Sequence, residues 1–165
     1  MTKINSLQEL LIDEMHDLYD AETQLIKALP KMAEAATNPQ LKAGFQEHGE
    51  QTKGHAARLE RALSDLGEKP RGKSCQAMEG LIKEGKESIS EKGPDAIRDA
   101  NLIGAAQRVE HYEIAAYGTA RAFAEALGLR EIASLLKQTL DEEAATDRKL
   151  TEMAQRVNQD ALHAA

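Results

Sequence analysis

Four long segments of this chain carry apolar residues at helical spacing, and residues that begin or end helices bound each segment. The first covers residues 7–36, where Ser6 and Glu9 form a capping box ahead of a stripe of leucines. Pro30 lies inside this stripe, so we expect a bend in the helix and not a break. A chain with such stripes is restricted to long helices that pack side by side.

The other helix boundaries follow from residues of the same kinds. Asn38 and Pro39 start a second helix, which ends near Gly67, and Asp95 is the expected cap of a later helix. Gly128 is the tight turn between the last two helices. The five predicted helices cover residues 7–36, 39–66, 74–91, 95–127 and 129–158.

Composition supports an all-α fold. Aromatic residues make up 3% of the 165 residues, Trp is absent, and Ala, Leu, Glu and Lys dominate. The four long helices predict a bundle of two hairpins, with the short helix over 74–91 as the crossover between them. We expect one domain over residues 1–165, because the chain length suits a single hydrophobic core.

Charge and hydropathy argue against several classes of partner. The net charge of −7 is spread over interspersed acidic and basic residues, so no basic stripe for nucleic acid is present. No apolar run approaches the roughly 20 residues of a membrane span, and the start MTKINSLQEL does not resemble a signal peptide. We therefore expect a cytoplasmic protein that binds neither nucleic acid nor membrane. The single cysteine, Cys75, is expected to be an idle thiol.

Carboxylates interrupt the apolar stripes of three of the long helices. In the first helix Glu22 takes the place of an apolar residue, and in the helix over 95–127 Glu113 is central on the stripe with Glu110 one turn before it. In the last helix Glu143 is central, with Asp147 beside it. A bundle core normally places leucine or alanine at such positions, so these acids need an explanation.

The second helix is interrupted by imidazoles instead. His48 and His55 lie between the apolar residues Phe45 and Leu59. Taken singly, histidines on a helix flank are more often structural than metal-ligating.

These interruptions are expected to share one level of the bundle. Residues equidistant from a hairpin turn come level, which pairs Glu113 with Glu143 and brings Glu22 close to His55. Burying carboxylates together costs several kcal/mol each unless cations compensate them. Oxygen-rich clusters with imidazole suit iron or manganese, and a pair of ions bridged by glutamate is a known solution in bundle cores.

Several stretches resemble the ferritin-like superfamily, and most closely its YciF-type bacterial stress proteins. They are LYDAETQLIKAL, AMEGLIKEG, AAQRVEHYEIAAYGT and LLKQTLDEEAATDRKLT. The resemblance implies a bundle that binds two metal ions, iron in preference to manganese, and that reacts with oxygen or peroxide. It also implies a role in stress and a homodimer.

Some of the metal-ligand positions of the superfamily match residues of this chain, and others do not. Glu110 and Glu113 match the paired glutamates on the third helix of rubrerythrin-like members, and Glu22 matches the glutamate of their first helix. The Glu-x-x-His signature is broken in both places where it belongs, because Lys53 follows Glu50 and Thr146 follows Glu143. His48, His55 and Asp147 are the candidates to replace the missing ligands. The predicted metal ligands are Glu22, His48, His55, Glu110, Glu113, Glu143 and Asp147.

Two other interpretations stay open. The acids could form a buried salt-bridge network with Lys53, Arg108 or Arg148. The protein could also be a non-catalytic structural or interaction bundle that acts as a dimer, through an alanine-rich face around Ala115, Ala116 and Ala120 or through the crossover helix.

Overall fold

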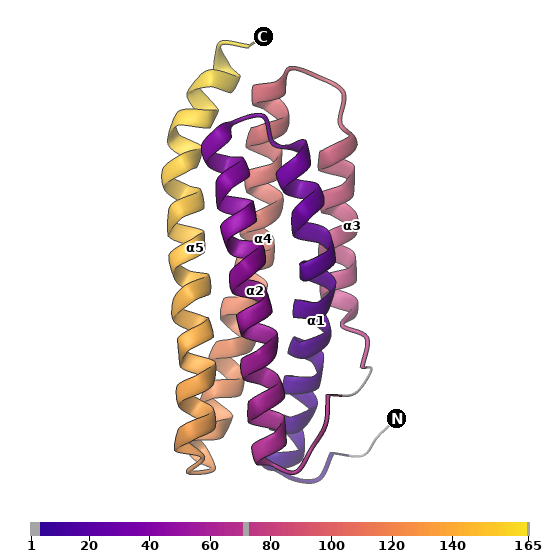
Figure 1. The fold of residues 1–165 in the computed structure, drawn as a ribbon, viewed down its shortest axis with the longest axis vertical. Helices are drawn as coiled ribbons and strands as arrows, with labels where there is room; N and C mark the ends of the chain where they lie inside the picture. The colour runs from indigo at the N-terminus through magenta and orange to yellow at the C-terminus, as the bar shows by residue number, and fades with distance from the viewer. Residues whose placement is uncertain (1–3, 71–72, 165) are drawn as a thin grey trace.

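The structure, a computed structural model, describes residues 4–70 and 73–164, and its regular elements are all helices (Figure 1). Residues 71 and 72 of the polar loop after the second helix lie outside the described part. In chain order the helices are α1 (Leu7–Ala35), α2 (Pro39–Asp65), α3 (Gln76–Ser90), α4 (Asp95–Ala126) and α5 (Arg130–Leu162).

Two helical hairpins form the bundle. α1 packs against α2 and α4 packs against α5, while α3 crosses between the hairpins and lies along α1 and α4 (Figure 1). The predicted all-α, ferritin-like bundle with a crossover helix is confirmed. No helix of the described residues is long and apolar enough to cross a membrane.

The helix ends follow the predicted local chemistry in most places. Ser6 Oγ accepts a hydrogen bond from the Glu9 amide, and Asn38 Oδ1 caps the first turn of α2. Gly128 has a φ of 73°, which lets the chain turn sharply between α4 and α5. α1 is continuous through Pro30, so the proline does not break it.

Two predicted boundaries are wrong. Asp95 is the first residue of α4 and not its cap, because its carboxylate pairs with Arg98 at 2.5 Å and Pro94 takes the cap position. α5 continues to Leu162 instead of ending at residue 158, since Val157 and Ala161 are buried and hold the last turns on the bundle.

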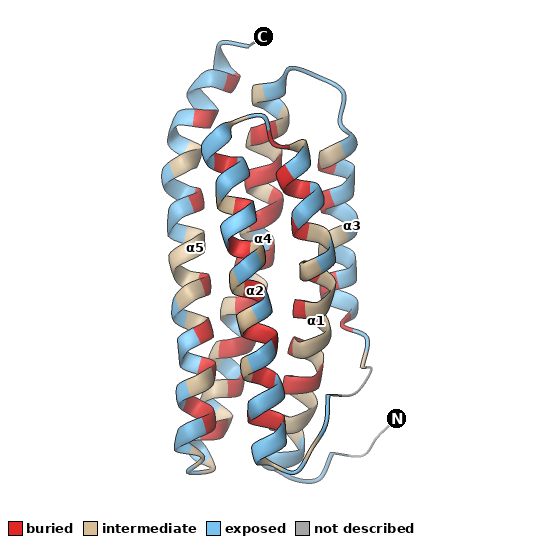
Figure 2. Ribbon diagram, viewed as in Figure 1, coloured by how far each residue is buried: buried red, intermediate tan, exposed pale blue. Residues whose placement is uncertain are grey.

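The apolar core has two parts, one toward each end of the bundle. Along α1, Leu18 belongs to one part and Leu25 to the other, and along α4 Ala116 and Val109 divide in the same way. The buried faces of all helices point inward (Figure 2). Between the two apolar parts, the predicted polar layer takes up the middle of the bundle.

One buried carboxylate outside this layer fixes the α1–α2 turn. Asp99, 3% exposed, accepts hydrogen bonds from the amide and hydroxyl of Thr37 at 2.9 and 2.7 Å, and from the amide of Asn38 at 2.7 Å. The second hairpin thereby holds the turn of the first.

Asp99→Ala is expected to lower the free energy of unfolding by about 3 kcal/mol, because it leaves three donors without their charged acceptor. Urea denaturation measures the change. Asp95→Ala, on the exposed face of the same helix, is the control and should stay within about 0.5 kcal/mol of the parent protein. A loss below about 1 kcal/mol for Asp99→Ala would contradict this role.

Candidate metal centre

Six of the seven predicted ligands converge in the middle of the bundle. Each of the four long helices contributes at the same level, and the spacing within a helix keeps its contributions on one face. All six side chains are buried, with exposures from 0 to 4%. They are Glu22 of α1, His48 and His55 of α2, Glu110 and Glu113 of α4, and Glu143 of α5.

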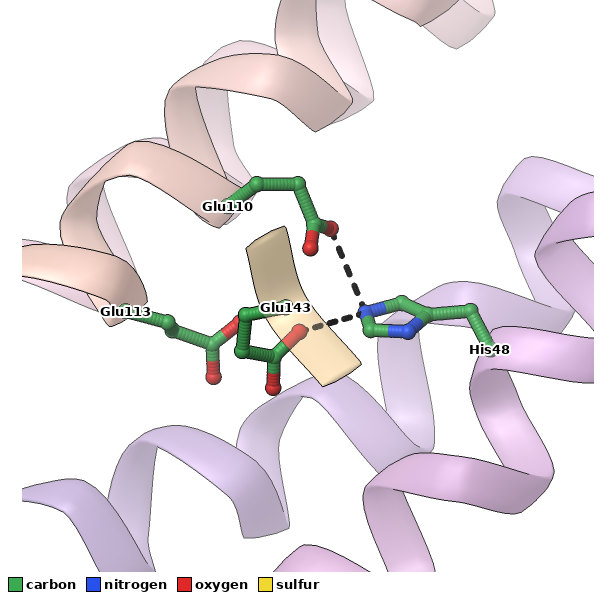
Figure 3. A group of neighbouring side chains, drawn as sticks. All are labelled: His48, Glu110, Glu113 and Glu143. Carbon is green, nitrogen blue, oxygen red and sulfur yellow. Dashed lines mark ion pairs between the residues drawn. The ribbon is translucent and has the colours of Figure 1, made fainter. Parts of the chain in front are cut away.

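The first group of donors joins three helices. His48 Nε2 lies 3.2 Å from Glu110 Oε1 and 3.7 Å from Glu143 Oε2 (Figure 3). Glu113 completes the group, and one donor atom from each of the four side chains lies within 4.8 Å of all the others. Figure 3 shows these side chains pointing toward one another from α2, α4 and α5.

The second group shares a residue with the first. His55 Nδ1 lies 2.8 Å from Glu143 Oε1 and 3.5 Å from Glu22 Oε1, and the three donors again lie within 4.8 Å of one another. One oxygen of Glu143 faces each imidazole. Glu143 is therefore common to both groups of donors.

Many polar atoms of the cluster have no hydrogen-bond partner. Among the described residues, every buried side-chain nitrogen or oxygen without such a partner belongs to these six residues. The inward nitrogens of both histidines are included, although each lies within ion-pair distance of a carboxylate. Both oxygens of Glu113 and of Glu143 are included as well. Native proteins rarely bury so many polar atoms without a hydrogen bond, so the donor set fits bound cations.

An outer pair orients His55. Its Nε2 lies 2.8 Å from Glu142 Oε2, and Arg58 holds the same carboxylate through two hydrogen bonds of 2.7 and 2.8 Å. The bond with Arg58 keeps the pKa of Glu142 below its ordinary value, so this carboxylate stays ionised and accepts a hydrogen bond from Nε2–H of His55. In a neutral His55 the lone pair is then on Nδ1, which faces Glu22 and Glu143.

The other histidine and Glu22 also have outer contacts. Thr146 Oγ1 donates to a backbone carbonyl of its own helix and lies 3.5 Å from His48 Nδ1, which leaves His48 Nε2 facing the cluster. The Tyr117 hydroxyl is fully buried and donates a hydrogen bond of 2.5 Å to Glu22 Oε1. The two contacts orient His48 and Glu22, two of the candidate metal ligands, toward the centre of the bundle.

Without cations, the histidines carry the compensating charge. Burial opposes protonation of His48, but the carboxylates of Glu110 and Glu143 outweigh it and raise the His48 pKa to about 9. Burial likewise opposes protonation of His55, and Glu143 and Glu22 raise its pKa to about 10. The metal-free cluster therefore holds both imidazoles protonated at neutral pH.

The carboxylates divide into two kinds. Burial and the neighbouring carboxylates raise the pKa of Glu113 well above its ordinary value, and burial raises that of Glu110 to about 7. Burial raises the pKa of Glu22 too, whereas for Glu143 the two imidazoles overcome burial and lower its pKa. Glu113 forms no ion pair with either imidazole, and neither of its oxygens has a hydrogen-bond partner, so nothing in the described part of the chain offsets the cost of burying its charge.

Asp147 does not join the cluster. Its carboxylate accepts from Gln107 at 3.0 Å and lies 3.3 Å from His111 Nε2, at the outer face of α4 and α5. Asp147 lies one turn after Glu143 and about 40° further round the helix axis, and its short side chain reaches Gln107 and His111 instead of the cluster.

The cations of the salt-bridge interpretation lie elsewhere. Lys53 pairs with Glu50 at 2.7 Å on the surface, and Arg108 and Arg148 are exposed. Within the described chain, none of the three forms an ion pair with the buried carboxylates.

Sequence reasoning missed the outer contacts. Arg58 and Glu142 act on the cluster, yet neither lies on an apolar stripe where a charge would draw attention. Their roles depend on where α2 and α5 face each other, which helical periodicity within one segment does not report.

Known proteins share this fold at several levels of similarity. The family model described as a domain of unknown function, DUF892, matches residues 6–162. Protein YciF of Escherichia coli (strain K12) is 46% identical over 152 residues, or 92% of each chain. The crystal structure of the E. coli stress protein YciF matches with a TM-score of 0.92 and 44% identity, over 94% of this chain and 99% of that one.

Two further structures widen the comparison. YcfI of Rhodopseudomonas palustris, for which a structural role has been suggested, matches with a TM-score of 0.87 and 44% identity over 90% of this chain and 95% of its own. A ferritin-like, diiron-carboxylate protein of Bacillus anthracis str. Ames is 17% identical over 92% of this chain and 99% of its own, with a TM-score of 0.71, which shows the fold alone. The chain therefore belongs to the DUF892 family, together with YciF, and has the ferritin-like fold.

Proposed function

We propose that the protein binds two metal ions in the middle of the bundle, iron in preference to manganese, and that this centre reacts with oxygen or peroxide. The observation that carries the proposal is the set of buried polar atoms without a hydrogen-bond partner, which among the described residues is confined to six side chains from four helices. A fully buried cluster of four carboxylates is costly for the protein alone, and metal ions would remove the cost.

The number and kind of donors also support two ions. Ferritin-like di-metal proteins combine four glutamates and two histidines, and this chain places the same set in its core. The placement differs, because α2 supplies both histidines and no glutamate. His48, Glu110 and Glu113 would hold one ion and Glu22 and His55 the other, with Glu143 common to both groups.

When bound, an iron pair supplies the electrons for reduction of oxygen or peroxide. The residues of the chain hold and orient the donors. The pair of Arg58 and Glu142 fixes the proton of His55, Tyr117 positions Glu22, and burial excludes bulk water from the carboxylates. Since the E. coli relative is a stress protein, we extend a role in stress to this chain.

The test is an anaerobic titration of the metal-free protein with ferrous iron, followed by admission of oxygen. We expect saturation at about two irons per chain and a new near-ultraviolet absorption band once oxygen enters. Absence of saturable binding would contradict the metal centre. Binding of iron with no response to oxygen or peroxide would reject the redox part alone.

The second candidate is a non-catalytic structural bundle, which the suggested role of the R. palustris relative favours. The two surfaces first considered for dimer contacts are partly internal, because Ala116, Ala120 and Met78 are buried within the monomer. The homodimer thus stays a prediction from the resemblance, and the cytoplasmic location stays a prediction from the sequence. A dimer that forms equally with and without metal, in a protein inert to oxygen, would favour this candidate.

A further inference from the structure

A mainly apolar cavity of about 330 Å³ lies beside the candidate metal centre. All five helices contribute to its wall, in the half of the bundle that contains the α1–α2 turn. Its volume is at the lower end of the range for small-molecule sites. Its apolar wall includes Leu25, Leu29, Met32, Phe45 and Leu150.

The inner end of this cavity is the metal centre itself. His48 and Glu110 line the cavity, and both belong to the first group of metal donors. His55 and Glu22 do not line it. A molecule in the cavity would therefore approach the centre from the side of His48.

The exposed edge of the cavity is positively charged. Lys27 and Lys31 project from one face of α1, and Lys86 projects from the neighbouring α3. None of the three forms an ion pair with any described residue. The fourth lysine of the wall, Lys149, is paired with Glu47 at 2.9 Å. Three unpaired cations at one opening are notable in a chain with a net charge of −7.

We propose that this cavity binds a free, single-chain fatty acid, with its carboxylate at Lys27, Lys31 and Lys86 and its hydrocarbon chain along the apolar wall. Each methylene that leaves water for the apolar wall favours binding, and the lysines select an anionic head group. The small volume favours one chain over two. That the bound acid is a substrate of the centre rests on the proposed function, whereas its binding does not.

The first test is calorimetric titration of the metal-free protein with decanoate below its micelle concentration. We expect one decanoate per chain, bound at least tenfold more tightly than decanol, which has the same chain without the charge. Equal affinities would overturn the assignment of a carboxylate ligand, and absence of saturable binding would overturn the site. Because no metal is present, failure of the iron titration would leave this test intact.

Two glycines of α3 offer a matched pair of variants that tests where decanoate binds. Gly85 is buried and lines the cavity, and a Cβ there would meet Met32 Sδ at 3.8 Å, an ordinary contact. Gly85→Leu should fit the fold, occupy the cavity and weaken decanoate binding at least tenfold. Gly80→Leu is the control, since a Cβ at exposed Gly80 has no neighbour within 4 Å. Equal affinity in the two variants would show that decanoate binds elsewhere and overturn the proposal.

Charge reversal tests the role of the lysines. The double variant Lys27→Glu and Lys31→Glu should weaken decanoate binding at least tenfold and leave decanol binding unchanged. Lys42→Glu, an exposed lysine of α2 that does not line the cavity, is the control. A double variant that binds decanoate like the control would overturn the assignment of the head group.

Discussion

Replacing Glu143 with alanine is expected to abolish metal binding at both sites. Glu143 is the one residue common to the two groups of donors, and each of its oxygens faces a different imidazole. Its loss removes an anionic ligand from each ion and the bridge between them. Iron content per chain after anaerobic loading and desalting measures the effect, and it should fall from about two to near zero.

The matched control for this variant is Glu152→Ala. Glu152 is an exposed glutamate of the same helix, so the change removes the same charge at a distance from the cluster. Iron content in this control should equal that of the parent protein. Two irons bound by the Glu143 variant would contradict the bridging assignment.

A second variant separates loss of ligands from loss of fold. Glu113 is fully buried, and neither of its oxygens has a hydrogen-bond partner. Glu113→Ala should therefore bind less metal while the metal-free protein unfolds at a temperature no lower than the parent. In a salt-bridge network the same change would instead destabilise the protein by a few kcal/mol, because it orphans a buried cation.

The second large effect concerns pH. The metal-free protein is expected to lose several kcal/mol of stability as the pH rises from about 6.5 to about 10. The pKa values of His48 and His55 are raised in the folded state to about 9 and about 10, against 6.5 for the free side chain. A raised histidine pKa stabilises the fold fully below 6.5, and this contribution disappears as the pH passes the folded value.

The buried acids act in the same direction. Because burial raises the pKa of Glu113 and Glu110, their ionisation at rising pH also disfavours the folded state. Urea denaturation at a series of pH values measures the slope. The double variant His48→Gln and His55→Gln is the control, and its stability should change much less over the same range. An equal slope in parent and variant would contradict the role of the imidazoles.

Metal binding should show the complementary pH dependence. An imidazole must lose its proton before it can bind a cation, so binding releases protons and the apparent affinity should rise with pH. The two effects have one cause. At pH values below the raised pKa of the histidines, protons compensate the carboxylates, and metal ions would replace those protons when they bind.

The positions of the buried acids could be predicted because each helix has a fixed period. Glu22, Glu113 and Glu143 interrupt stripes of apolar residues, and distance from a hairpin turn gives their level along the bundle. The same reasoning included Asp147, which lies one turn after Glu143 and about 40° from it round the helix axis. With its short side chain, this rotation places the Asp147 carboxylate beside Gln107 and His111 instead of in the cluster.

Contacts between helices could not be predicted in this way. The Arg58–Glu142 pair joins α2 to α5, and the Asp99 carboxylate reaches the α1–α2 turn from α4. Both depend on which faces of distant segments meet. The end of α5 was also missed, because burial of Val157 and Ala161 against the bundle outweighs the weak local signals of the tail.

The division of the apolar core has a consequence for how the helices align. Stripes of leucine and alanine alone would permit one long helix to slide along another by a heptad with little loss of packing. In this bundle such a slip would move Glu143 or Glu113 out of the middle layer and against the apolar side chains on either side. Only one vertical register brings all the carboxylates and imidazoles together. The six polar side chains therefore fix the register of the helices and select one packing among several that hydrophobic contacts alone would tolerate.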